Sequence, residues 1–197
     1  MSRFIESIQV KDGKLQNIPF HNERFNRTLR NFFPGATEID LQKAVKVPET
    51  LGPGLHKCRV AYTKEIEDIE FAVYQPRIIR SLRIVDSPDI DYTYKYADRS
   101  GLEKLFAQRG DCDDILIVKN GFITDTYAAN IIFFDGTKWY TPSTPLLRGT
   151  NRARLLAEGK ITEAEIKVRD LHQFQHARTI NAMLDDAPVI AITNIIK

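Results

Sequence analysis

The chain has 197 residues, of which 43% are hydrophobic and 27% charged, and this composition argues against intrinsic disorder. Its length is enough for one large domain or two small ones, with a hydrophobic core that needs no disulfide or structural metal ion for stability. The formal net charge is +2, and acidic residues are interleaved with basic ones along the chain. The charge pattern therefore argues against a nucleic-acid partner.

The cysteine and apolar patterns restrict the class of protein further. Cys58 and Cys112 lie far apart and outside any metal-ligand spacing, so we expect two small apolar packing residues, with neither a disulfide framework nor a metal site. The first residues lack the apolar stretch of a signal peptide, and apolar runs such as residues 187–192 are too short to span a bilayer. We expect a cytoplasmic protein with no membrane partner.

In the N-terminal half, β-branched and aromatic segments predict five strands, at residues 4–10, 15–20, 55–63, 69–74 and 78–85. The first two flank Asp12 and Gly13, a pair typical of a hairpin turn.

Two helices are predicted among these strands. The first opens at residues 21–24, with Asn22 as its cap and apolar residues at helical spacing from Phe25 onward, and it stops at Pro34. A second, short helix covers residues 41–45.

In the C-terminal half, two dipeptides predict hairpins, Asn120-Gly121 and Asp135-Gly136. A loop enters a helix near Asn151. The predicted strands of this half lie at residues 114–118, 122–126, 131–134, 138–140, 165–168 and 188–192.

A break at residues 87–89 separates a predicted N-terminal α+β lobe, residues 1–86, from a C-terminal lobe, residues 87–197. The first helix of the second lobe carries Leu102 and Phe106 on one face. Helices and strands are mixed and hairpins dominate, so the predicted fold class is α+β.

Three features could bind an anionic ligand. Gly149, Thr150 and Asn151 stand at a helix start, where backbone N–H groups suit a phosphate. Arg24, in the first turn of the other predicted helix, has donors matched to phosphate oxygens. Asp125 closes a strand after a hairpin. Taken alone, each favours a structural explanation: a capped helix with nothing bound, a solvated arginine, and a turn-capping carboxylate.

A family resemblance extends over nearly the whole chain. It is carried, in order, by residues 21–25 (HNERF), 94–99 (YKYADR), 121–130 (GFITDTYAAN), 139–142 (WYTP), 147–152 (LRGTNR) and 181–183 with 188–189. In order and spacing these segments resemble the class IV aminotransferases, which have the two-lobed fold type IV architecture of pyridoxal phosphate enzymes. The chain begins about a strand and a turn later than that pattern, so the resemblance implies a shortened N-terminal lobe.

The resemblance implies pyridoxal 5'-phosphate as cofactor and assigns a role to each candidate residue. Lys95 would bind the cofactor aldehyde as a Schiff base and later move protons as a free base. Asp125, in the place of the family's glutamate, would pair with the ring nitrogen. Arg24 and the turn at residues 149–151 would hold the phosphate. Asp125 is one methylene shorter than glutamate, and Thr150-Asn151 replaces the family's Ile-Thr.

Two segments, residues 95–99 and 125–130, resemble the 4-amino-4-deoxychorismate lyase branch of the family more than its branched-chain aminotransferases. The implied reaction produces 4-aminobenzoate, a folate precursor, and pyruvate, with Lys95 as the base. The alternatives are a branched-chain or D-amino-acid aminotransferase, and a relative that binds the cofactor without turnover.

The resemblance also implies a small-molecule amine substrate and a homodimer. Arg59 and Arg99 are candidates for binding substrate carboxylates, and a surface role is equally open for each. His21 is expected to be a structural residue at a helix start.

Overall fold

The computed structural model describes residues 2–184 and 186–196. The chain forms two compact units. The first consists of Met1–Pro76 with Tyr94–Asp98, and the second of Arg77–Thr93 with Arg99–Lys197. The boundary predicted between residues 86 and 87 falls inside the second unit, whereas the segment that carries Lys95 belongs to the first.

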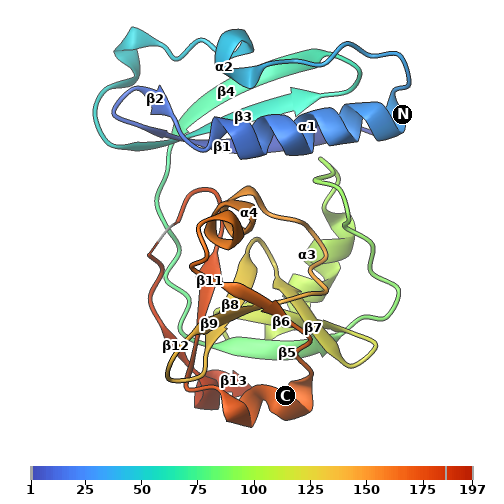
Figure 1. The fold of residues 1–197 in the computed structure, drawn as a ribbon, viewed down its shortest axis with the longest axis vertical. Coiled ribbons are helices and arrows are strands. Elements are labelled where there is room, and N and C mark those ends of the chain that lie inside the picture. Colours follow the sequence, from blue (N-terminus) through green and yellow to red (C-terminus); the bar gives the residue numbers. More distant parts are fainter. Residues whose placement is uncertain (1, 185, 197) are drawn as a thin grey trace. The chain divides into compact units, whose positions relative to one another are not determined.

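The first unit is an antiparallel sheet covered on one face by a helix (Figure 1). The sheet has the order β2-β1-β3-β4, with β1 (Phe4–Lys11), β2 (Lys14–Leu15), β3 (Leu55–Tyr62) and β4 (Ile66–Val73). The helices are α1 (Ile18–Phe32), α2 (Leu41–Ala44) and the 3-10 helix η1 (Glu49–Leu51). The core lies where alternate residues of β1 and β3, such as Ile8 and Val60, meet Phe25 and Leu29 of α1.

The start of α1 corrects two predictions. The predicted strand at residues 15–20 is wrong beyond Leu15, because α1 already begins at Ile18. Asn17, with a φ of 55°, is the residue before the helix, and a proline in the first turn suits a helix start there. Asn22 is therefore not the cap, and its side chain instead contacts Asp40 and the backbone N–H of Leu41.

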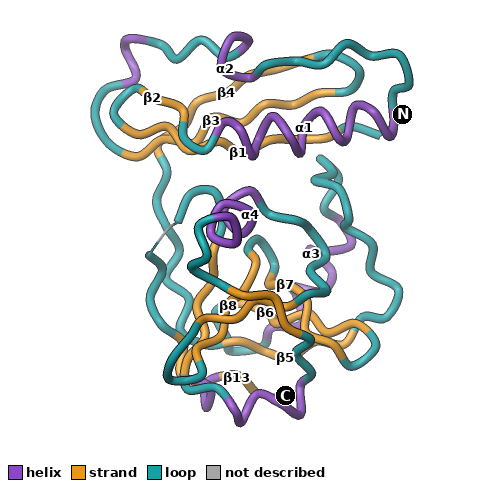
Figure 2. Tube along the Cα trace, viewed as in Figure 1, coloured by secondary structure: helices purple, strands orange, loops and turns teal. Residues whose placement is uncertain are grey.

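The second unit is a nine-stranded sheet with short helices around it (Figure 2). Its main path is β10-β9-β8-β7-β6-β5-β13, while β11 pairs with β8 and β12. The strands are β5 (Leu82–Asp86), β6 (Asp114–Lys119), β7 (Phe122–Thr126), β8 (Asn130–Phe134), β9 (Trp139–Pro142), β10 (Thr162–Ala164), β11 (His176–Ile180), β12 (Ile190–Ala191) and β13 (Ile195–Ile196). The helices are α3 (Ser100–Phe106), α4 (Thr150–Ala157), and the 3-10 helices η2 (Ala107–Arg109), η3 (Val168–Gln173) and η4 (Ile192–Asn194). In the described part of the chain, no helix is long and apolar enough to cross a membrane.

Local turn chemistry explains which strands of this unit were predicted. Asn120 and Gly121 have φ values of 53° and 82°, as a tight hairpin between β6 and β7 requires. The predicted α+β class and both C-terminal hairpins are confirmed. The strand predicted at residues 165–168 is wrong, because the neighbouring strand β10 ends at Ala164 and η3 begins at Val168. Strand β11 was missed, since the polar residues His176 and Arg178 alternate with its apolar ones. Arg178 of β11 lies over the ring of Trp139, a contact that only the tertiary structure provides.

Both cysteines are free and buried, as the sequence predicts. Burial raises the pKa of the Cys58 thiol to about 12, so the unreactive thiol form dominates at neutral pH.

Candidate active site

Lys95 lies beside the first strand of the first unit. The N–H of Ile5 donates to the carbonyl of Lys95 at 2.9 Å, and the N–H of Ala97 donates to the carbonyl of Arg3 at 2.8 Å. Tyr96 forms an antiparallel bridge with Phe4. These bonds pair a short segment with β1 and hold the backbone of Lys95 in place, and the covalent role of Lys95 stays a prediction.

Arg24 is part of a buried charged cluster on the core face of the same sheet. Its Nε and Nη2 donate to Oε1 and Oε2 of Glu6 at 2.8 and 2.6 Å, and His21 Nδ1 lies 2.7 Å from Oε2. Only 4% of Arg24 is exposed, and Glu6 is fully buried. The interpretation of Arg24 as a solvated arginine is therefore wrong. Since α1 begins at Ile18, Arg24 also stands in its second turn and not its first.

The protonation states of this cluster follow from its burial and contacts. Burial raises the pKa of Glu6, but Arg24 and the hydrogen bonds from His21 and Arg24 outweigh burial and hold this pKa at about 2. Burial lowers the pKa of His21, although Glu6 opposes that change. At neutral pH, Glu6 is thus an anion that accepts from neutral His21 and cationic Arg24. The signal in the sequence was a glutamate inside the buried alternation of Phe4, Ile8 and Val10.

The two arginines predicted for substrate carboxylates already have protein partners. Arg59 in β3 stands opposite Glu70 of β4, with Nη1 and Oε2 3.3 Å apart. In the second unit, Arg99 donates from Nη2 to the carbonyl of Tyr127 at 2.8 Å and lies over the Tyr127 ring at 4.5 Å. Both contacts give these residues structural roles, and their part in substrate binding stays a prediction.

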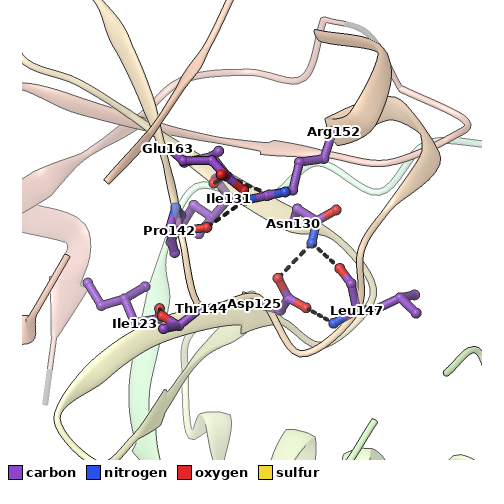
Figure 3. A network of polar contacts seen from close by, with 10 residues as sticks. Ile123, Asp125, Asn130, Ile131, Pro142, Thr144, Leu147, Arg152 and Glu163 are labelled. Atoms are coloured by element: carbon purple, nitrogen blue, oxygen red, sulfur yellow. Dashed lines mark hydrogen bonds and ion pairs between the residues drawn. The ribbon is translucent and has the colours of Figure 1, made fainter. Parts of the chain in front are cut away.

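Asp125 is a buried carboxylate in β7 of the second unit, where it is 5% exposed (Figure 3). Its Oδ1 accepts from Nδ2 of Asn130 at 2.7 Å, and its Oδ2 accepts from the N–H of Leu147 at 2.8 Å. Burial raises its pKa to about 6, against the opposing effect of these hydrogen bonds. Its hydrogen-bond partners are neutral amides, and the charge of Arg152 lowers its pKa without offsetting burial, so a further cation beside the carboxylate would stabilise the charged form.

Asn130, at the start of β8, joins Asp125 to the loop that precedes α4 (Figure 3). Its Nδ2 also donates to the carbonyl of Leu147 at 2.8 Å. A Cβ atom on Gly149 would lie only 2.0 Å from Oδ1 of Asn130, so the close approach requires glycine. The sequence reasoning used Asn130 only as part of a motif and missed this positioning role.

The N-terminus of α4 is held by hydrogen bonds from one of its own buried side chains. Thr150 and Asn151 are buried in its first turn, whose N–H groups lie outside the hydrogen-bond ladder of the helix. Nδ2 of Asn151 donates to the carbonyls of Asn181 and Leu184, both at 2.9 Å. The Asn151 side chain therefore fastens the segment near residue 181 to α4, and only its backbone is suited to a phosphate.

A Gly149→Ala substitution tests the contact with Asn130. The new methyl group would overlap the amide oxygen, so we expect a loss of about 1–3 kcal/mol in the free energy of unfolding. In the double variant Gly149→Ala/Asn130→Ser, the loss in the free energy of unfolding should be smaller than the sum of the losses in the two single variants, because the smaller serine side chain removes the overlap. Urea unfolding measures all three, and strictly additive losses would contradict the contact.

The arrangement in the second unit suits the ring and phosphate of pyridoxal phosphate. A buried carboxyl with neutral partners can pair with a protonated ring nitrogen, and the glycine-led start of α4 presents the N–H groups that an anion requires. Together with the α+β fold, these features fit the pyridoxal phosphate enzymes of fold type IV.

The chain belongs to the class IV aminotransferase family, whose model matches residues 3–192. The predicted family and the cofactor that characterises it are thereby confirmed. An uncharacterized protein of Haemophilus influenzae is 44% identical over 185 residues, which cover 93% of this chain and 98% of that protein.

Solved structures agree with this assignment. A protein of Haemophilus somnus provisionally named 4-amino-4-deoxychorismate lyase has 34% identity and a TM-score of 0.85, over 93% of this chain and 97% of that one. A branched-chain aminotransferase of Thermoproteus uzoniensis has 15% identity and a TM-score of 0.78, over 98% of this chain and 78% of that one, and shares the fold.

Proposed function

We propose that this chain is a pyridoxal phosphate-dependent lyase that converts 4-amino-4-deoxychorismate to 4-aminobenzoate and pyruvate. The observation that carries the cofactor assignment is the buried Asp125 carboxyl, whose partners are neutral amides. The choice of substrate is supported by the near full-length likeness to the Haemophilus somnus protein.

Each candidate residue has one task in this proposal. Pyridoxal phosphate supplies an aldehyde that condenses with amines and a ring that accepts electrons when a neighbouring C–H bond breaks. Asp125 would keep the ring nitrogen protonated, and Arg24 and the first-turn N–H groups of Thr150 and Asn151 would bind the phosphate. Lys95 would hold the aldehyde through its side-chain amine.

As a free amine, Lys95 would also be able to act as a base. We propose that it takes the proton from the amine-bearing carbon of the substrate. Loss of that proton accompanies breakage of the C–O bond between the substrate ring and the enolpyruvyl group. The six-membered ring of the substrate thereby becomes aromatic. The departing enolate takes up one proton to become pyruvate, which balances the proton that the substrate lost. No further co-reactant is consumed.

A product assay tests the proposal against the aminotransferase alternative. Purified protein with added pyridoxal phosphate should form 4-aminobenzoate and pyruvate in equal amounts from 4-amino-4-deoxychorismate, with no 2-oxo acid added as an amino-group acceptor. The comparison is a panel of L- and D-amino acids with 2-oxoglutarate. Turnover of the panel alone would identify an aminotransferase, and absence of both activities in cofactor-loaded protein would favour a non-catalytic relative.

We also propose that the active form is a two-fold dimer, as the family resemblance implies. Sedimentation of the active protein as a monomer would contradict this.

A further inference from the structure

We infer that Glu6 and His21 are positioning residues that orient the Arg24 guanidinium for the cofactor phosphate. The inference rests on the proposed function, since it takes Arg24 as a phosphate ligand. Glu6 engages the edge of the guanidinium formed by Nε and Nη2, with two bonds of 2.8 and 2.6 Å. Because Glu6 takes Nε and one N–H of Nη2, a phosphate would bind through Nη1 or the other N–H of Nη2.

The cluster is built to hold that orientation. Glu6 lies in the middle of a strand that pairs along its length with β3, so its carboxylate has a fixed origin. His21 donates to the same Oε2 that accepts from Nη2, which restricts rotation of the carboxylate. A planar guanidinium that is already hydrogen-bonded along one edge loses little further conformational entropy when a phosphate binds its other edge.

The charge balance of the cluster also supports the positioning role. Glu6 and Arg24 cancel, and neutral His21 adds no charge, so the buried cluster is neutral without ligand. A buried arginine that lacked Glu6 would be an uncompensated charge, whereas the pair can remain folded and preorganised. Glu6 thus acts on the phosphate only through Arg24.

The test compares equilibrium binding of pyridoxal phosphate with that of pyridoxal, which has the same aldehyde and ring but no phosphate. Outer hydrogen-bond partners of metal ligands typically change affinity by 10- to 100-fold, and we expect an effect of about tenfold here. Glu6→Gln should weaken pyridoxal phosphate binding by that factor and leave pyridoxal binding unchanged. Glu67→Gln, which removes a carboxylate from an exposed ion pair of the same unit, is the matched control and should change neither.

Two further variants keep the test decisive. Glu6→Asp keeps the charge but withdraws the carboxylate by one methylene, so it should also lower the ratio of the two affinities even if Glu6→Gln does not fold. In an Arg24→Gln background, Glu6→Gln should have no further effect on that ratio.

The outcomes separate the inference from the function on which it rests. Equal weakening of both ligands in the Glu6 variants, or no weakening in Glu6→Asp, would overturn the positioning role. If Arg24→Gln itself left the ratio unchanged, Arg24 would not be a phosphate ligand, and that part of the proposed function would fail instead.

Discussion

Replacing Lys95 by alanine should reduce turnover by about four decades or more. In the proposed function, the substitution removes both the amine that would bind the cofactor aldehyde and the base that would move the substrate proton, and each contribution is large. The measurement is the rate of 4-aminobenzoate formation at saturating pyridoxal phosphate. Borohydride treatment of the unaltered protein should fix the cofactor permanently on Lys95, which peptide mapping would locate.

Lys104 provides the control, because it lies in α3 of the second unit and is exposed. Lys104→Ala should keep the parent rate and the parent borohydride adduct. An adduct mapped to Lys104 or Lys119 in place of Lys95 would refute the assignment.

The Asp125→Asn variant should keep its cofactor and lose two to three decades in rate. A neutral amide no longer stabilises a positive charge on the ring nitrogen, and loss of one such electrostatic partner typically raises the barrier by about 2–4 kcal/mol. Turnover and cofactor absorbance, measured on the same sample, separate the two effects. Asp125→Glu, which restores the family's residue, should retain more activity than Asp125→Asn. A parent rate in cofactor-loaded Asp125→Asn would make Asp125 a structural residue.

The same aspartate gives the cofactor-free protein a distinct pH dependence. Burial raises its folded-state pKa from 3.8 to about 6, so the folded protein binds this proton more tightly than the unfolded chain does. The resulting stabilisation, up to about 3 kcal/mol, is complete below about pH 4 and is lost as the pH rises to about 6. The difference in stability between Asp125→Asn and the unaltered protein should change over this interval, and a constant difference would refute the raised pKa. Glu6 has the opposite sign: its pKa is lowered from 4.5 to about 2, so its stabilising charge is lost as the pH falls through that range, mostly below the interval of Asp125.

Features that depend on neighbours in the sequence were predictable. The turns at Gly13 and Gly121 adopt the positive φ angles that glycine favours, and they fix which strands pair as hairpins. The order and spacing of the motifs were enough for the resemblance to place the chain in its family and to imply its cofactor, because these motifs carry the chemistry that the family shares.

Other features depend on groups distant in the sequence, and only the tertiary structure decided them. Glu6 and Arg24 are buried together because β1 and α1 pack face to face, and this contact makes an apparent surface arginine a buried, paired one. Asn130 closes on Gly149 because β8 lies beside the loop before α4. The pKa of Asp125 follows from the same enclosure. Propensity and spacing describe single segments, whereas burial and charge pairing arise where segments meet.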